Sequence, residues 1–168
     1  MSDSLFKPVP NDKESTCFAC GAANPLGLQL VFTTDETIVR TEYTIRKEFA
    51  GWSNLTHGGI LATILDETMA WTSIYLKQKY ILTKNMEIQF LKPVRAGETV
   101  TARGWIEEEI SHREVRISAE ILNSEGAVCV MGGGNMVLFN PVGFRKLNLV
   151  SRDFLERFEK IVFRPIDT

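Results

Sequence analysis

The sequence has no long hydrophobic run, no block of basic residues, and only two histidines and three cysteines in 168 residues. No apolar stretch reaches the roughly 20 residues that a membrane-spanning helix needs. The formal net charge of −2 gives no electrostatic basis for binding nucleic acid. The N-terminal residues lack the basic and then apolar pattern of a signal peptide. We therefore expect a soluble, cytoplasmic protein that binds neither nucleic acid nor membranes.

The few cysteines do not form a disulfide framework. Cys17 and Cys20 make a Cys-x-x-Cys pair, which is compatible with zinc or redox chemistry. A zinc site needs about two further ligands, and the remaining Cys129, His57 and His112 are scattered without ligand spacing. No βαβ pattern surrounds the pair, so it does not read as a thioredoxin-like motif. We interpret the pair as local turn structure and expect no metal and no cofactor.

The strongest helical pattern lies in residues 54–76. A His57-Gly58-Gly59 turn leads directly into it. Apolar residues then recur at helical spacing and fill two neighbouring stripes: Ile60, Leu61, Ile64, Leu65, Met69, Trp71, Tyr75 and Leu76. So wide an apolar arc predicts a helix that is buried on most sides.

A carboxylate in the middle of this helix is the main functional candidate. Asp66 has mostly small residues on its face, which leaves room for a ligand or a second subunit, whereas Glu67 shares its stripe with bulkier residues. Free N–H groups at a helix start stabilise developing negative charge, and Gly58 and Gly59 allow close approach there. The combination predicts an acyl-transfer site. The alternative is that Asp66 only pairs with a basic residue or caps a backbone group.

The rest of the chain alternates with the period of β-strands. A polar arm (1–16) and a structured turn (17–27) come first, and a connector (140–148) precedes an amphipathic helix (152–161). The expected strands are residues 28–32, 38–46, 83–91, 98–107, 113–122 and 127–139. Three glycines, 132–134, interrupt the last strand and suggest a bulge or the close approach of another backbone. We expect an α+β domain over 17–140, with 1–16 as an arm and 141–168 as an extension.

This order resembles the hotdog fold, in which a curved antiparallel sheet of about six strands wraps around one long helix. More narrowly, it resembles the phenylacetate-type (PaaI-like) and THEM4-like branch of acyl-CoA thioesterases. Three stretches carry the resemblance: Cys17-Phe-Ala-Cys20-Gly21 with Asn24-Pro25-Leu-Gly27-Leu28; His57-Gly58-Gly59 with Asp66; and Phe90-Leu-Lys-Pro93-Val with Gly97-Glu98.

The resemblance implies a thioester hydrolase that needs no metal. Asp66 would act as general base or nucleophile, and the N–H of Gly58 would polarise the thioester carbonyl. His57 and, after a one-residue shift, Thr83 would also belong to the catalytic site. For His57 we favour a role in fixing the turn or packing across an interface over proton transfer. The upstream asparagine of the phenylacetate-type enzymes aligns with Gly51.

The resemblance also implies how substrate and partners bind. We expect acyl-CoA as substrate, with Asn54, Gly59, Asn85, Lys92 and Arg95 as binding residues. Other cations available for the CoA phosphates are Arg103, Arg113 and Arg116. A homodimer with a continuous sheet, or a tetramer built from two dimers, should place the carboxylate against the other subunit's strand near residues 83–87. The alternatives are a non-catalytic acyl-CoA-binding or scaffold protein, and a hydratase of the same fold.

Overall fold

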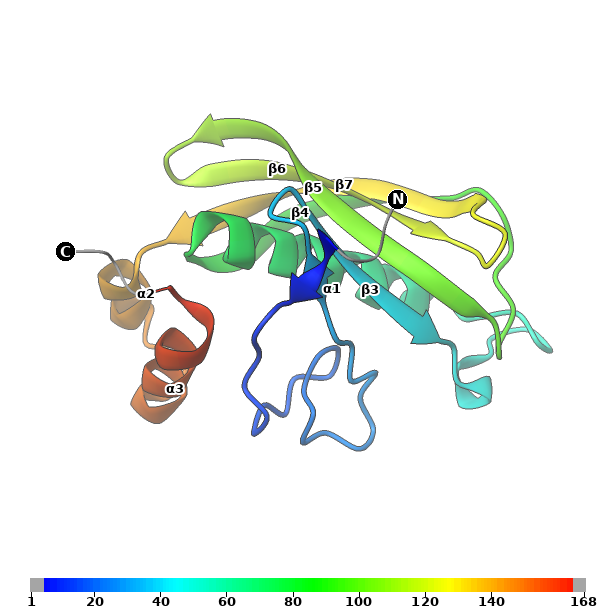
Figure 1. Ribbon diagram of the computed structural model, residues 1–168, viewed down its shortest axis with the longest axis horizontal. Coiled ribbons are helices and arrows are strands. Elements are labelled where there is room, and N and C mark those ends of the chain that lie inside the picture. The colour runs from blue at the N-terminus through cyan, green and yellow to red at the C-terminus, as the bar shows by residue number, and fades with distance from the viewer. Residues whose placement is uncertain (1–4, 165–168) are drawn as a thin grey trace.

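The computed structural model describes residues 5–164, which form an α+β fold with one seven-stranded antiparallel sheet (Figure 1). The strand order across the sheet is β1-β2-β3-β5-β6-β7-β4, so β4 is an edge strand. The described part of the chain contains no helix that is long and apolar enough to span a membrane. The strands are β1 (Lys7–Pro8), β2 (Thr33–Thr34), β3 (Ile38–Thr44), β4 (Tyr80–Phe90), β5 (Thr99–Ser111), β6 (Glu114–Leu122) and β7 (Val128–Phe139). The helices are the 3-10 turn η2 (Lys47–Phe49), α1 (Gly58–Lys77), α2 (Pro141–Leu147) and α3 (Arg152–Val162).

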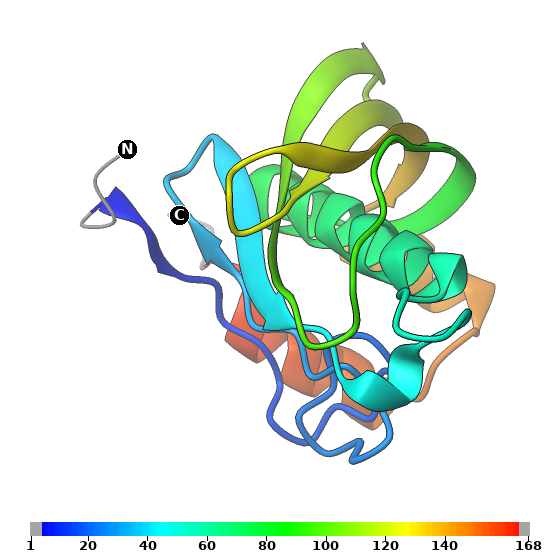
Figure 2. The same cartoon turned by 90° about the vertical axis from the view of Figure 1, so that its right-hand side faces the viewer.

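The central helix α1 lies in the concave face of the sheet, which curves around it (Figure 2). Its buried side chains include Leu61, Ile64, Leu65 and Met69, which have the helical spacing expected from the sequence. The helix ends at Gln78, which adopts the left-handed conformation (φ 51°) and whose N–H donates to the carbonyl of Ile74. The expected hotdog arrangement of sheet and helix is therefore confirmed.

The sheet alternates as the sequence predicts. On β6, every second residue is buried, namely Val115, Ile117, Ala119 and Ile121. The glycines of β7 allow β4 to pass close by: a Cβ on Gly132 would lie 2.3 Å from the carbonyl oxygen of Glu87. The pairing of β4 with β7 also shifts register between Thr83 and Asn85. Of the two alternatives expected at the glycine run, the close approach is therefore present, whereas the register shift lies in β4 opposite Asn135 and Met136.

The side of α1 that faces away from the sheet is covered by the N-terminal loops and by the C-terminal helices (Figure 1). Trp71 of α1 packs between Phe32 and Phe158, with ring centroids 5.9 and 6.2 Å away. Tyr80 stacks on Phe144 of α2 at 4.4 Å. The terminal segments thus complete the core around the second half of α1, because they bury the aromatic side chains of Trp71 and Tyr80.

Two sequence-based expectations about secondary structure were wrong. Residues 28–32 do not form a strand, although Leu28 and Leu30 are buried as the alternation predicts, because Gln29 has a positive φ of 54° that interrupts the extended backbone. The connector 140–148 contains α2, whose N-cap Asn140 accepts a hydrogen bond from the N–H of Gly143 at 2.7 Å.

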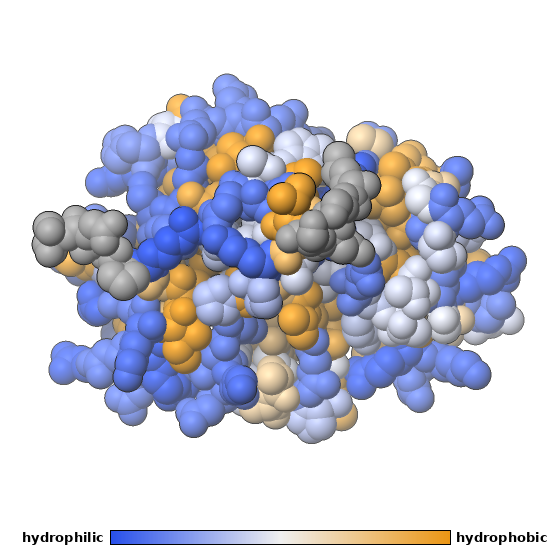
Figure 3. Space-filling view, viewed as in Figure 1, coloured by the Kyte–Doolittle hydropathy of each residue, from blue (hydrophilic) through white to orange (hydrophobic). Residues whose placement is uncertain are grey.

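The surface shows no single apolar face in this view. Figure 3 shows hydrophobic residues in several separate patches between hydrophilic ones. The exposed apolar residues of β4 include Leu82, Met86 and Phe90, with exposed fractions of 39%, 37% and 56%. The edge strand is thus the long element that combines open backbone groups with exposed apolar side chains, which is the usual composition of a pairing edge.

Candidate active site

The side chain of His57 caps the N-terminus of α1. Its Nδ1 accepts a hydrogen bond from the N–H of Gly59 at 2.9 Å, and its backbone is extended (ψ 132°) as an N-cap requires. The N–H of Gly58, the residue between His57 and Gly59, has no hydrogen-bond acceptor among residues 5–164. The cap thus holds the turn and leaves the N–H of Gly58 free for a ligand.

A cavity of about 280 Å³ lies beside this free N–H. The ring of Phe90 stands over Gly58, where a Cβ would be 3.5 Å from the ring edge. The other lining side chains are apolar except those of Thr56 and Lys92, and Lys92 is exposed. An oxygen atom bound at Gly58 would therefore meet one backbone donor, an apolar wall and a cation.

The loop before α1 is fixed to the loop after β4. Leu55 and Arg95 form an isolated antiparallel bridge. The Arg95 guanidinium donates to Asn54 Oδ1 at 3.1 Å, and the N–H of Ala96 donates to the carbonyl of Asn54 at 2.8 Å. Asn54 and Arg95, both predicted to bind substrate, thus contact each other and shape this end of the site.

Asp66 lies further along α1, half-buried, and its carboxylate faces β4. The Thr83 hydroxyl donates to Asp66 Oδ1 at 3.0 Å. The structure therefore brings together two residues that the resemblance assigns to the catalytic site, and they come from one chain. Asn85, two residues along β4, has its Oδ1 bonded to the N–H of Asn135 at 3.2 Å. We expected Asp66 to face the strand near residues 83–87 of a second subunit. In the structure, it contacts Thr83 on β4 of its own chain.

The predicted residues therefore fall into two groups. His57, Gly58 and Gly59 lie at the helix start, and Asp66 and Thr83 lie where the middle of α1 meets β4. Because an α-helix rises about 1.5 Å per residue, Gly58 and Asp66 are separated by roughly 12 Å along the axis. One chain does not bring the N–H of Gly58 and the carboxylate of Asp66 to a single carbonyl group.

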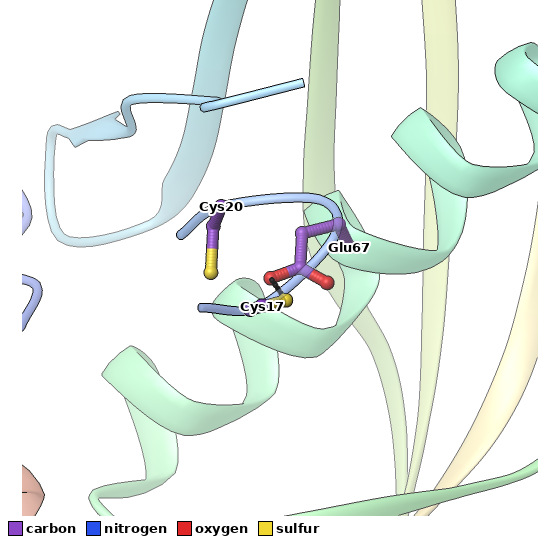
Figure 4. A group of neighbouring side chains, drawn as sticks. All are labelled: Cys17, Cys20 and Glu67. Atoms are coloured by element: carbon purple, nitrogen blue, oxygen red, sulfur yellow. Dashed lines mark hydrogen bonds between the residues drawn. The ribbon is translucent and has the colours of Figure 1, made fainter. Parts of the chain in front are cut away.

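The other acidic residue of the helix, Glu67, points elsewhere. Its Oε1 accepts a hydrogen bond from the indole Nε1 of Trp71 at 3.1 Å, and Cys17 Sγ lies 3.8 Å from the same oxygen (Figure 4). Burial raises the pKa of Glu67 to about 7. Sequence spacing gave no sign of this contact, because Cys17 and Glu67 are 50 residues apart.

The remaining candidates are placed away from the helix start. The Arg103 guanidinium Nε donates to Glu120 at 2.6 Å, and the Arg116 guanidinium bonds Glu87 and Glu107. These two arginines are thus engaged in side-chain pairs on the sheet. Cys129 is fully buried in β7, and His112 is exposed in the turn between β5 and β6.

Comparison with known proteins finds a family whose sequence profile matches the central segment. Residues 54–130, which contain α1, β4, β5 and β6, match the sequence profile of the thioesterase superfamily. The match covers 77 of the 168 residues. No curated protein sequence matches the chain significantly.

Solved structures of thioesterase-superfamily proteins share the fold. One such protein superposes with a TM-score of 0.66 at 23% identity over 73% of this chain and 60% of its own length, so the chain spans less than two thirds of that protein. The PaaI protein of the E. coli phenylacetic acid degradation operon gives a TM-score of 0.62 at 20% identity, covering 67% of this chain and 81% of that one. A hypothetical thioesterase from Streptococcus pneumoniae TIGR4, solved with coenzyme A, gives 0.58 at 19% identity, covering 62% and 82%.

Proposed function

We propose that this protein is a member of the thioesterase superfamily and hydrolyses the thioester of an acyl-CoA to a free acid and CoA. The observation that carries the proposal is the free N–H of Gly58 at the start of the same helix that holds Asp66 against Thr83. The first group is a donor for a developing oxyanion, and the second is an oriented carboxylate. The streptococcal protein solved with coenzyme A supports CoA as the carrier.

The chemistry follows from the two groups. The carbonyl oxygen of the thioester accepts a hydrogen bond from the N–H of Gly58, which makes the carbonyl carbon more electrophilic. Asp66 removes a proton from a water molecule whose oxygen attacks that carbon, or the carboxylate attacks it directly and water later hydrolyses the anhydride. The C–S bond breaks, and the CoA sulfur leaves as a thiolate that takes up a proton.

A complete site on this proposal needs two copies of the chain. The separation of roughly 12 Å between Gly58 and Asp66 exceeds the reach of a carboxylate to a carbonyl held at Gly58. The edge strand β4 carries Thr83 and has no neighbour on its outer side in the described sheet. Pairing of two β4 edges would join the sheets and bring Asp66 of one copy towards Gly58 of the other.

The phosphates of CoA would bind at the mouth of the cavity beside Gly58. Lys92 lines this cavity, and Arg95 lies on the same loop with its guanidinium on Asn54. Both side chains are exposed and positive, as a phosphate group requires. Phe90 and Leu61 would contact the acyl group close to the carbonyl.

The test is release of free thiol from a panel of acyl-CoAs, from acetyl to palmitoyl and including phenylacetyl and benzoyl. We expect turnover of at least one member and a loss of about 100-fold or more in Asp66→Asn, because a general base contributes about 10²–10⁴ in rate. Asp153→Asn is the matched control, since it makes the same change at an exposed position in the first turn of α3. Full activity in Asp66→Asn would exclude the proposed mechanism.

A non-catalytic acyl-CoA-binding or scaffold protein is the second candidate. It is favoured by Gly51, which stands where the phenylacetate-type enzymes have asparagine; a Cβ there would lie 3.3 Å from the His57 side chain. Binding of acyl-CoA by the folded protein, without turnover of any panel member, would support this candidate instead.

A further inference from the structure

Outside the Asp66 site, three side chains with metal-binding atoms converge in one place (Figure 4). Cys17 and Cys20 lie in the loop before β2, and Glu67 lies on α1. The two sulfur atoms and a carboxylate oxygen all lie within 4.8 Å of one another. None of the three takes part in the proposed hydrolysis.

The carboxylate is held in its orientation. The indole Nε1–H of Trp71 donates to Glu67 Oε1 at 3.1 Å, and Trp71 is itself fixed in the core. Cys17 Sγ approaches the same oxygen to 3.8 Å. A hydrogen bond from a buried neighbour to a ligand carboxylate is the usual support of a metal site, because it fixes the ligand's direction.

The cluster also has no cationic side chain to balance it. Among residues 5–164, no lysine or arginine forms an ion pair with Glu67; the nearby Arg157 guanidinium instead faces Asp12 and Glu14, at 3.2 and 3.5 Å.

We propose that Cys17, Cys20 and Glu67 bind one Zn²⁺ ion, with the fourth coordination position open to the adjoining cavity. Zn–S and Zn–O bonds of about 2.3 and 2.1 Å place neighbouring ligands of a tetrahedral ion roughly 3.5–3.8 Å apart. The observed spacing reaches this after side-chain movements of about 1 Å. All three residues line one cavity of about 340 Å³, which leaves room for a water molecule as fourth ligand.

Binding involves no redox step. The ion replaces the protons on the thiols and on the Glu67 carboxyl, and these protons pass to solvent. The site joins the N-terminal loop to α1 at the position next to Asp66. Zn²⁺ binding should therefore raise the melting temperature of the protein, since only the folded chain brings the three ligands together.

The test uses the full chain, purified under reducing conditions without chelator. We expect about one zinc per chain by elemental analysis, because three direct ligands give tight binding. After removal by a chelator, Co²⁺ should restore an intense thiolate-to-metal absorption in the near ultraviolet and a tetrahedral band in the visible. Substoichiometric zinc together with no thiolate band on Co²⁺ addition would overturn the proposal, as would a Cys17–Cys20 disulfide that persists in reductant.

The variants are Cys17→Ala and Glu67→Gln. The glutamine side chain keeps an oxygen acceptor for the Trp71 indole. Since second-shell changes already cost 10–100-fold in metal affinity, loss of a direct ligand should weaken Zn²⁺ binding by about 100-fold or more. The matched control is Cys129→Ala, which removes the remaining cysteine, buried in β7, and should leave zinc content unchanged. Unchanged affinity in Glu67→Gln would overturn the three-ligand assignment.

The zinc site does not depend on the thioesterase mechanism. Asp66→Asn should abolish hydrolysis and keep the zinc, so the failure of one proposal is distinguishable from the failure of the other. Circular dichroism of each variant shows whether it is folded, and the zinc and Co²⁺ measurements on the unsubstituted chain decide the outcome even if a variant does not fold.

Discussion

The hydroxyl of Thr83 on β4 donates a hydrogen bond to the carboxylate of Asp66 on α1, over a distance of 3.0 Å. The contact joins the central helix to the edge strand of the sheet. It holds the carboxylate towards β4, away from the helix start. A functional role for Asp66 therefore depends on what lies against this edge strand.

Removing the Thr83 donor should slow turnover without weakening substrate binding. We expect Thr83→Val, which keeps the shape of the side chain, to lower kcat by about tenfold with little change in KM, because a hydrogen bond to a charged group contributes about 1.5–3 kcal/mol when buried and less when exposed. Thr83→Ser retains the hydroxyl and should keep most of the activity. Steady-state kinetics of the unsubstituted protein and the two variants measure these changes. Equal kcat values in all three would show that Thr83 has no part in the mechanism.

A single substitution at Gly58 can remove the N–H that we propose as the oxyanion donor. Proline has no N–H, fits the first position of a helix, and follows the extended backbone of His57 (ψ 132°) without strain. We expect Gly58→Pro to lower kcat by about 10²–10³-fold, as for other oxyanion donors. Gly58→Ala keeps the N–H and places its Cβ 3.5 Å from Phe90, an ordinary contact, so it should stay active. Equal losses in both variants would point to packing.

Mixing two inactive variants tests whether one site uses two chains. If Gly58 and Asp66 of a site come from different copies, a dimer of one Gly58→Pro chain and one Asp66→Asn chain has one intact site. Random exchange of subunits in a twofold dimer should then restore about a quarter of the unsubstituted activity. Each variant alone is the control, and no recovery after proven subunit exchange would place both residues of a site in one chain.

Acid should weaken the contact between the two ends of the chain at Glu36. The Glu36 carboxylate forms ion pairs with Lys7 and with Arg164, and the distance to the Arg164 guanidinium is 2.7 Å. It also accepts a hydrogen bond from the Tyr75 hydroxyl at 3.0 Å. Hydrogen bonds from the Lys7 ammonium, which has the larger effect, and from the Arg164 guanidinium lower the pKa of Glu36 from 4.5 to about 2. The stabilisation is present above about pH 4.5 and is lost as the pH falls from there towards 2.

Urea unfolding at several pH values measures this effect. Since Glu36 is 41% exposed, its share of the unfolding free energy should be at most about 1 kcal/mol. Glu36→Gln should be less stable than the unsubstituted protein near neutral pH, and the difference should shrink towards pH 2. Glu125→Gln, in the exposed turn before β7, is the matched control. A difference that does not change with pH would mean that Glu36 acts through packing.

Local patterns in the sequence determined the central helix and the long strands. The apolar stripe of residues 60–76 and the alternation in residues 113–122 reflect burial within a single element, which the neighbouring residues alone specify. The short helix α2 was missed, although Asn140 before Pro141 is a typical helix start. Residues 28–32 were misread because their alternating burial comes from covering α1, while Gln29 breaks the strand geometry.

The contacts between distant segments were decided only by the tertiary structure. Asp66 and Glu67 are adjacent in sequence, yet one meets Thr83 on β4 and the other meets Cys17 on the N-terminal loop. Neighbouring residues on a helix point in different directions, so each carboxylate takes its partner from whichever element packs on its side. The sequence by itself determined that this helix carries acidic residues behind a His-Gly-Gly start, and the packing around the helix decided which group each one serves.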